Sequence, residues 1–252
     1  MTYDSVLKQW NKKKITSLAD LDEALDNFRI LFAYNSNVIE NPETTYHNTR
    51  EIFENGKVVG YTGDLRTIFE IQNQKKCYEM LRSRIINKEP LSPSLILDIH
   101  KELMQGCYDE TRYEKGERPG EFKHHDYVTG DNIGCSPEDV EHEIEKLCKE
   151  INDAGSDKVL TIAAYLHLRF ESIHPFADGN GRVGRTLMNY YLMINDYPPT
   201  VIYGEDKDAY YMALAVYDKS EQIDGFVKFL EEQTIKTWTK KESPKKSLKL
   251  FL

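Results

Sequence analysis

Residues 174–185 read HPFADGNGRVGR, and they follow a run of mainly apolar residues, VLTIAAYLHLRFES, at 159–172. The run is apolar on most faces, which is typical of a helix at the centre of a core. His174-Pro175 ends that helix, because proline disfavours the α conformation in the residue before it and has no N–H to donate. We therefore expect His174 at the mouth of a buried helix, with Phe176 anchored in the core.

A glycine-rich turn follows this anchor and leads into a second helical pattern. The turn consists of Gly179, Asn180 and Gly181. Unpaired N–H groups and the positive end of the helix dipole make such a helix N-terminus a favourable place for an anion. Arg182 and Arg185 lie one helical turn apart and add two forked cations for phosphate oxygens. The turn and the two arginines therefore predict a polyphosphate site.

Two further residues of the stretch can carry chemistry. Asp178 faces the same space, and a lone carboxylate beside a polyphosphate suits Mg²⁺, which takes few protein ligands and shares phosphate oxygens. His174 titrates near neutral pH and can take a proton from an attacking hydroxyl. Taken singly, each residue also fits a structural role. Their density within one short stretch favours nucleotide phosphoryl chemistry, and the chain has no GxxxxGK[ST] or GxGxxG motif elsewhere.

Composition limits the class of protein. With 252 residues, of which 40% are apolar, the chain can form one large core or two modest ones. A net charge of −9 argues against broad nucleic-acid binding, which needs a basic stripe. No stretch approaches the roughly 20 apolar residues of a membrane span, and no signal peptide is evident. Four cysteines without a CxxC pair indicate neither a disulfide framework nor a zinc site. We expect a cytoplasmic protein that binds neither membrane nor nucleic acid.

Helical periodicity runs through most of the chain. Apolar residues at steps of four and three predict a helix over 17–35 that begins at Ser17, and the same spacing follows Ser136 as N-cap. Further helices are predicted over 65–87, after Ser92-Pro93 and over 223–238. Two stretches rich in Gly, Pro, Asn and Asp, 54–64 and 113–137, predict loops or small hairpins. One helical domain with an N-terminal helical segment is the simplest partition.

The opening stretch also resembles a known signature. HPFADGNGRVGR matches HPFx[D/E]GNGRxxR at every fixed position, and the chain is identified from it as a member of the Fic-domain family. The resemblance covers residues 90–235. It implies a mainly α protein, a Fic-type helical bundle with a small β-hairpin flap at GEFKHHDYVTGDNI, 120–133. The parts it implies are an N-terminal helical region (1–88), a catalytic domain (89–238) and a basic C-terminal tail (239–252).

Most members of that family transfer AMP from ATP to a Ser, Thr or Tyr hydroxyl of a protein and release pyrophosphate. The resemblance implies the same substrates here, with Mg²⁺ or Mn²⁺ as cofactor and the target protein or the enzyme itself as acceptor. The roles it implies are general base for His174, metal ligand for Asp178, anion hole for Gly179, Asn180 and Gly181, β-phosphate ligand for Arg182 and γ-phosphate ligand for Arg185.

Other correspondences are less specific. Tyr210 falls where similar proteins have an aromatic residue near the nucleoside, although an aromatic at this spacing also fits a core. Asp218 lies where an Asn commonly contacts the nucleotide, so the chain departs from the family there. Thr129–Asn132 would border the nucleotide, and the edge of a hairpin there could pair with a target segment by strand addition. His124 and His125 are expected as exposed loop residues.

A second motif lies far upstream. SNVIEN, residues 36–41, fits [S/T]xxxE[G/N], the inhibitory helix motif of the same family. Ser36 and Glu40 are four residues apart and would share a helix face. So loose a pattern also fits an ordinary polar helix end. The resemblance implies that Glu40 pairs with Arg185, so that ATP binds with its α-phosphate badly placed for attack.

Three alternatives to inhibited AMP transfer remain open at this point. The same motif occurs in proteins that use other nucleotides or transfer phosphocholine. Some inhibited members also remove AMP, so the enzyme could be bifunctional or mainly de-AMPylating. A nucleotide-sensing binding module is the non-enzymatic alternative. A homodimer is expected from the resemblance alone, because regulated members of the family often pair.

Overall fold

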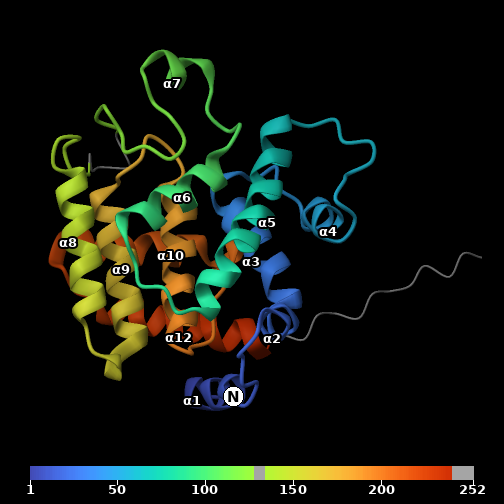
Figure 1. Ribbon diagram of the computed structural model, residues 1–252, viewed down its shortest axis with the longest axis vertical. Helices are drawn as coiled ribbons and strands as arrows, with labels where there is room; N and C mark the ends of the chain where they lie inside the picture. The colour runs from blue at the N-terminus through green and yellow to red at the C-terminus, as the bar shows by residue number, and fades with distance from the viewer. Residues whose placement is uncertain (128–133, 240–252) are drawn as a thin grey trace, which may run out of the picture.

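The structure is a computed structural model, described for residues 1–127 and 134–239. Over these ranges the chain folds into twelve α-helices and two short 3-10 turns, with no strand (Figure 1). The helices are α1 (Tyr3–Asn11), α2 (Leu18–Ala24), α3 (Asp26–Glu40), α4 (Tyr46–Asn55), α5 (Leu65–Ile86), α6 (Pro93–Met104), α7 (Glu110–Glu114), α8 (Val140–Asp153), α9 (Val159–Ile173), α10 (Asn180–Ile194), α11 (Lys207–Ser220) and α12 (Asp224–Thr239), and the 3-10 turns are η1 (Ser156–Lys158) and η2 (Gly204–Asp206).

The mainly α class is confirmed, whereas the predicted β-hairpin flap is not seen. Residues 120–127 and 134–135 contain no strand; the Lys123 N–H donates to the Pro175 carbonyl after α9, and the Cys135 N–H donates to the carbonyl of Ile173, the last residue of α9. Residues 128–133, which include the predicted nucleotide border Thr129–Asn132, lie outside the described residues. So does the basic tail beyond Thr239.

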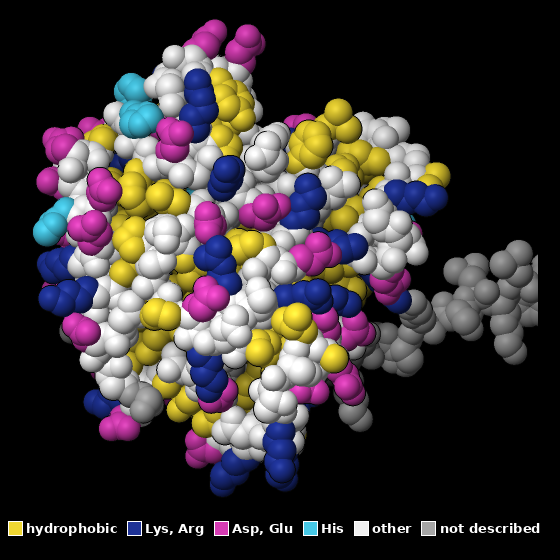
Figure 2. All heavy atoms as spheres, in the orientation of Figure 1, with side chains coloured by type: hydrophobic (Ala, Val, Ile, Leu, Met, Phe, Trp, Pro, Cys, Tyr) yellow, Lys and Arg dark blue, Asp and Glu magenta, His cyan; other side chains and the backbone are white. Residues whose placement is uncertain are grey.

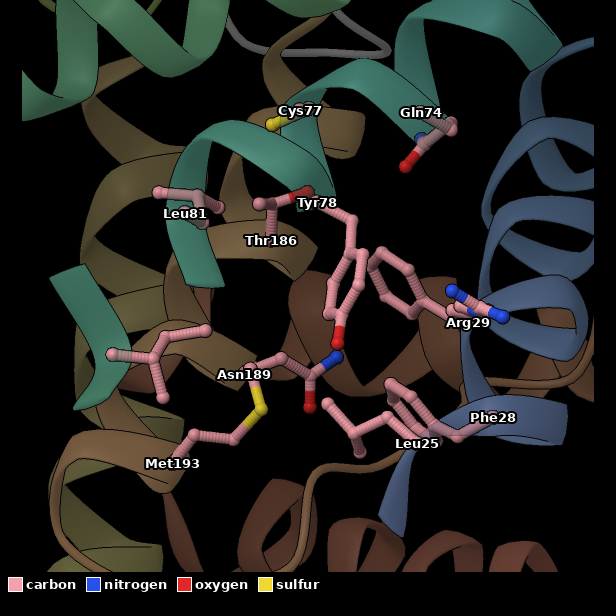
Figure 3. Close-up of a pocket in the computed structure, with 12 residues that line it drawn as sticks. Leu25, Phe28, Arg29, Gln74, Cys77, Tyr78, Leu81, Thr186, Asn189 and Met193 are labelled. Carbon is pink, nitrogen blue, oxygen red and sulfur yellow. The ribbon is translucent and has the colours of Figure 1, made fainter. Parts of the chain in front are cut away.

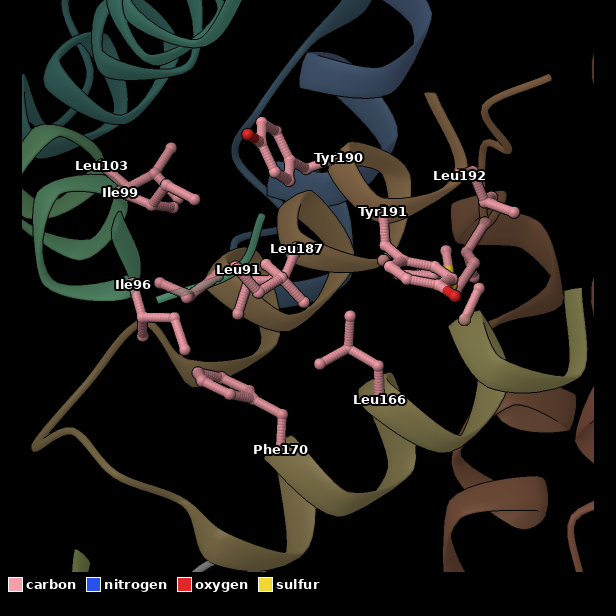
Figure 4. Packing of buried hydrophobic residues seen from close by; sticks show 14 of the residues in the cluster. Leu91, Ile96, Ile99, Leu103, Leu166, Phe170, Leu187, Tyr190, Tyr191 and Leu192 are labelled. Carbon is pink, nitrogen blue, oxygen red and sulfur yellow. The ribbon is translucent and has the colours of Figure 1, made fainter. Parts of the chain in front are cut away.

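The core is built around α9 and α10, which pack side by side with α6 and α8 against them (Figure 1). Figure 4 shows the contact from close by: Leu166 and Phe170 of α9 meet Leu187 of α10, and Ile96 of α6 closes the cluster. All four side chains are fully buried. Burying an apolar side chain of this size contributes about 1.5–3 kcal/mol, so this packing holds the two helices that flank HPFADGNGRVGR in a fixed relation.

Local capping explains where several helices begin. α6 starts as predicted, with the Ser92 hydroxyl accepting from the Leu95 N–H and Pro93 in the first turn. The prediction of Ser136 as an N-cap was wrong. α8 begins only at Val140, and the Ser136 hydroxyl donates instead to the Asp139 carboxylate at 2.8 Å. Residues 137–139 form a turn, so Ser136 lies one turn before α8 and Asp139 occupies its N-cap position.

The single helix predicted over 17–35 is two helices. Ser17 caps α2 as predicted, but the backbone leaves the helical region at Leu25 (φ −107°, ψ 8°) before α3 begins. Leu21 and Leu25 still both reach the core, where each is 1% exposed. α3 then runs on to Glu40, so the whole SNVIEN segment except Asn41 lies in one helix.

α3 packs across α5 and α10. Figure 3 shows a small pocket at this junction, where Phe28 of α3, Tyr78 of α5 and Met193 of α10 converge. The first half of α3 therefore meets its neighbours through apolar side chains. Its last two turns meet α10 through polar ones, which the next subsection describes.

None of the described helices is both long enough and apolar enough to span a membrane. All four cysteines are free thiols: Cys77, Cys107 and Cys148 are buried, and Cys135 is half-buried. On the face drawn in Figure 2, acidic and basic side chains are interspersed rather than gathered by sign.

Candidate active site

The turn between α9 and α10 is fixed by two buried anchors. α9 ends at Ile173, and His174 takes a left-handed conformation (φ 51°) while its N–H donates to the Phe170 carbonyl at 3.0 Å. Phe176 is fully buried, as predicted, and its ring lies 3.6 Å from that of His100 in a stacked arrangement. The loop therefore leaves α9 at one defined place.

Asn180 closes the same turn with its side chain. Its amide oxygen accepts from the Phe176 N–H at 2.9 Å, and its amide nitrogen donates to the Phe176 carbonyl at 2.8 Å. Gly179 precedes it in the left-handed region (φ 85°), which glycine adopts without strain. The Asn180 side chain is thus a clamp, and only the backbone N–H groups of the first turn of α10 are left for an anion.

His100 is a site residue that the sequence analysis did not identify. Its Nδ1 accepts from the Gly120 N–H at 2.9 Å, so in the neutral ring Nε2 carries the proton and donates to the Asp178 carbonyl at 3.1 Å. Burial lowers the pKa of His100 to about 3, which keeps this tautomer neutral. The residue thus ties the flap segment to the backbone of the motif.

His174 is a neutral imidazole at physiological pH. Burial is the largest cause that lowers its pKa, to about 4, and the positive charge of Lys123 acts in the same direction. A hydrogen bond with the backbone of Glu171 opposes both, and it fixes one side of the ring. A neutral, oriented imidazole is able to accept a proton from a substrate hydroxyl.

The segment around the predicted flap brackets this histidine. The Lys123 N–H donates to the Pro175 carbonyl and the Cys135 N–H to the Ile173 carbonyl, each at 2.9 Å. Gly134 lies so close that a Cβ on it would come within 2.7 Å of the His174 Cβ. The backbone before and after His174 is therefore held by residues far upstream in the chain.

Asp178 is surrounded by arginines. Its Oδ2 lies 2.8 Å from Nη2 of Arg66 and 3.6 Å from Nη2 of Arg112, and its Oδ1 lies 3.3 Å from Nη2 of Arg182. Burial alone would raise the pKa of Asp178, but these charges outweigh it and hold the pKa below its usual range. The carboxylate is therefore ionised. Neither Arg66 nor Arg112 was predicted, because both are distant in sequence.

Arg182 is paired with a carboxylate of α5. Its Nη1 lies 2.8 Å from Oε1 of Glu70 on α5, and the side chains of both residues are nearly inaccessible to solvent. Asn41 donates to the other oxygen of Glu70 at 2.9 Å. The predicted β-phosphate ligand is thus occupied by a carboxylate that the sequence analysis did not identify.

Arg185 is occupied in the same manner from α3. Its Nη2 lies 2.7 Å from Oε1 of Glu40, its Nε donates to the Ser36 hydroxyl at 3.1 Å, and Nη2 also donates to the Ser36 carbonyl at 2.9 Å. Arg185 as a whole residue is 1% exposed, whereas the side chain of Glu40 is 32% exposed. A Cβ at Gly181 would collide with the Glu40 carboxylate, so the glycine makes room for this pair.

The remaining predicted residues lie around the α9–α10 junction or on the surface. Tyr210 is 1% exposed, and its hydroxyl bonds His167 Nε2 at 2.9 Å and Arg185 at 3.5 Å, so it supports the guanidinium from within the core. Asp218 accepts from the Ser172 hydroxyl at 3.0 Å. His124 and His125 are exposed, as expected.

A family model matches the part of the chain that contains the α9–α10 junction. A model of the Fic/DOC family matches residues 90–192. The chain is 30% identical over 207 residues to the protein adenylyltransferase Fic of Drosophila persimilis, covering 81% of this chain and 39% of that protein. For the protein of that name from Drosophila melanogaster the identity is also 30%, with 81% and 40% covered. The chain therefore spans about two fifths of the length of these relatives.

Solved structures resemble almost the whole chain. A Fic-domain-containing signaling protein from Bacteroides thetaiotaomicron VPI-5482 superposes with a TM-score of 0.79 at 26% identity, covering 94% of each chain. Fic-1 from C. elegans has the same fold, with a TM-score of 0.73 at 22% identity over 92% of this chain and 69% of that one. The likeness therefore extends beyond residues 90–192, which the family model matches.

Proposed function

The chain carries a domain of the Fic/DOC family, and we propose that it is a protein adenylyltransferase that transfers AMP from ATP to a Ser, Thr or Tyr hydroxyl of a target protein or of itself. The observation that carries the proposal is the junction of α9 and α10. There a neutral His174 lies beside the N-terminus of α10 and an ionised Asp178. We assign residues 89–238 as the catalytic domain and residues 1–88 as the region that carries the inhibitory helix.

In the proposed reaction, the acceptor hydroxyl attacks the α-phosphorus of ATP. The new P–O bond forms as the bond to the β-phosphate bridging oxygen breaks, and pyrophosphate leaves. His174 takes the hydroxyl proton, for which its lowered pKa of about 4 leaves it in the unprotonated form. The N–H groups of Gly179, Asn180 and Gly181 would bind the phosphate oxygens on which charge develops.

We propose that Asp178 binds a divalent metal that arrives with the nucleotide, in exchange for arginines that now contact it. The described residues contain no group of three or more metal-ligating side chains, so a closed protein site such as zinc prefers is not found in this part of the chain. Mg²⁺ or Mn²⁺ bound together with a nucleotide needs only one or two carboxylates, and Asp178 is ionised. When bound, the metal would neutralise charge on the phosphates.

The arrangement of α3 supports an inhibited ground state. Glu40 and Ser36 between them bond two of the three guanidinium nitrogens of Arg185. The γ-phosphate would have to replace Glu40 on this cation to reach its productive place. We propose that ATP otherwise binds with its α-phosphate out of line with the acceptor hydroxyl. Ser36, Glu40 and Arg185 thus form the proposed inhibitory contact, supported by Tyr210.

Labelled ATP tests the activity. The protein is incubated with ATP labelled in the base or at the γ-phosphate, with and without Mg²⁺, and its intact mass is measured. Retention of the base label with one AMP added is expected, and retention of the terminal phosphate would instead mean a kinase. Nucleotide binding without any modification, in a variant freed of Glu40, would refute the transferase and favour a sensor. Loss of AMP from a modified protein would show the reverse activity.

Three finer points remain proposals. We propose that the protein acts in the cytoplasm and forms a homodimer, which size-exclusion chromatography with light scattering tests. Target pairing along residues 120–135 is a third proposal. The described part of that segment already reaches both flanks of His174 through Lys123 and Cys135, which supports a place for the target there.

A further inference from the structure

Glu70 of α5 has a buried side chain that binds two arginines. Its Oε1 lies 2.8 Å from Nη1 of Arg182 and 3.0 Å from Nε of Arg66, and its side chain is 2% exposed. Both arginines also reach Asp178, so the two carboxylates and two guanidinium groups form one closed cluster. Breaking a buried ion pair is costly, so Glu70 keeps these cations until another anion replaces it.

We propose that Glu70 is a positioning residue that withholds Arg182 from the β-phosphate, as a second restraint beside the Glu40–Arg185 pair. The inference rests on the proposed nucleotide site. Glu70, Arg182, Arg66 and Asp178 line one hollow with Glu40, so a phosphate that enters it meets the Glu70 carboxylate at the cation it needs. Nη1 of Arg182 already donates to Glu70, so a phosphate gains this donor only as Glu70 yields.

Asn41 connects the two restraints. It follows Glu40 directly in the chain, and its side-chain nitrogen donates to Glu70 Oε2 at 2.9 Å and to Thr67 Oγ1 at 3.0 Å. The end of α3 thus holds Arg185 through Glu40 and steadies the Glu70 carboxylate through Asn41. A shift of this segment would loosen both arginines together.

The number of phosphates on the nucleotide separates the two restraints. AMP lacks a β-phosphate and does not compete with Glu70. ADP competes with Glu70 but has no γ-phosphate to compete with Glu40, and ATP meets both carboxylates. The ratio of the AMP to the ADP dissociation constant therefore reports on Glu70 alone. A merely structural role of Glu70 would change the binding of both nucleotides in parallel.

The test is isothermal titration of the full chain with AMP, ADP and ATP, each with Mg²⁺ and in EDTA. Glu70→Gln is expected to tighten ADP binding at least roughly threefold and to leave AMP binding unchanged, since the amide no longer competes as an anion. Glu43→Gln is the matched control. Glu43 is exposed and lines the same hollow, and no side-chain ion pair is found for it within the described ranges.

ADP binding that is unchanged or weaker in a folded Glu70→Gln protein would overturn the inference, because Glu70 would then align Arg182 for the phosphate. If that variant does not fold, Asn41→Ala decides. This substitution removes one hydrogen bond to Glu70 and should tighten ADP binding by a smaller factor. Unchanged ADP binding would contradict the inference. Absent ADP binding in every variant overturns the inference too. Tighter ADP binding by the Glu70→Gln protein, with no AMP transfer, would instead refute only the proposed activity.

Discussion

Replacing Glu40 by glycine perturbs the inhibitory contact most directly. The Glu40 Oε1 to Arg185 Nη2 distance of 2.7 Å is that of a charge-assisted hydrogen bond, for which the net contribution is about 1.5–3 kcal/mol. Glu40 is 32% exposed, and screening by water favours the lower end of this range. A difference of about 1.4 kcal/mol is a factor of ten in a rate or an equilibrium. We therefore expect Glu40→Gly to raise AMP incorporation at least roughly tenfold.

The assay is the initial rate of label incorporation from α-labelled ATP, at several ATP concentrations and with thermal unfolding as a check of folding. Glu43→Gly serves as the control, because it removes an exposed carboxylate from the same hollow. Arg185→Ala should be inactive even in the Glu40→Gly background, since no cation is then left for the γ-phosphate. This order of effects separates relief of inhibition from a general loss of stability.

The inhibitory role would be refuted by a well-folded Glu40→Gly protein whose initial rates equal or fall below those of the wild type. A rise that Glu43→Gly reproduces would refute it as well, because the effect would then reflect the general charge of the hollow. Neither outcome bears on the proposed transfer reaction itself, since that depends on residues of the α9–α10 junction.

Three other predictions concern the remaining groups of the site. His174→Ala should abolish labelling while the dissociation constant of Mg·ATP stays nearly the same, and labelling at the wild-type rate would exclude His174 as the base. Asp178→Asn should remove most Mg²⁺-dependent activity, because a neutral amide is a poor metal ligand; full activity in EDTA would contradict it. Burial lowers the pKa values of His100 and His167 to about 3. The unfolded chain alone then takes up protons below pH about 6.5, so stability is present above that pH and falls by about 1.4 kcal/mol per pH unit for each histidine towards pH 3. Urea unfolding at pH 7 and pH 5 measures this loss, and equal free energies at the two values would contradict it.

Local chemistry decided which features were predictable from the sequence. The start of α6 followed from Ser92 and Pro93 because a cap and its helix are neighbours in the chain. The break at Leu25 could not be seen, since the apolar spacing continues through it and only packing against α5 and the core selects two helices. The Ser136 prediction failed because residues 137–139 form a turn before the helix, which begins only at Val140.

The site divides in the same way. The His174 and Asp178 positions came from one contiguous motif, whereas Arg66, Glu70 and Arg112 reach it from other elements through ion pairs that no local pattern encodes. The sequence does contain one signal for Glu70. It lies on the buried stripe of α5, where an unpaired charge would be costly. A carboxylate on such a stripe indicates a cation on the facing helix.

Helix geometry explains why two carboxylates can hold the two arginines of one motif. Residues three apart on an α-helix differ by about 60° in direction, so their long side chains can turn to different neighbours. Arg182 turns to α5 and Arg185 to α3. The motif spacing RxxR, which suits successive phosphates of one nucleotide, therefore also lets two flanking helices bind the cations separately. In the proposed mode of binding, a nucleotide with one phosphate would meet neither carboxylate, one with two would meet Glu70, and one with three would meet both. Relief of Glu40 alone thus favours ATP over ADP, and full engagement of the phosphates requires the end of α3 and the start of α5 to yield together.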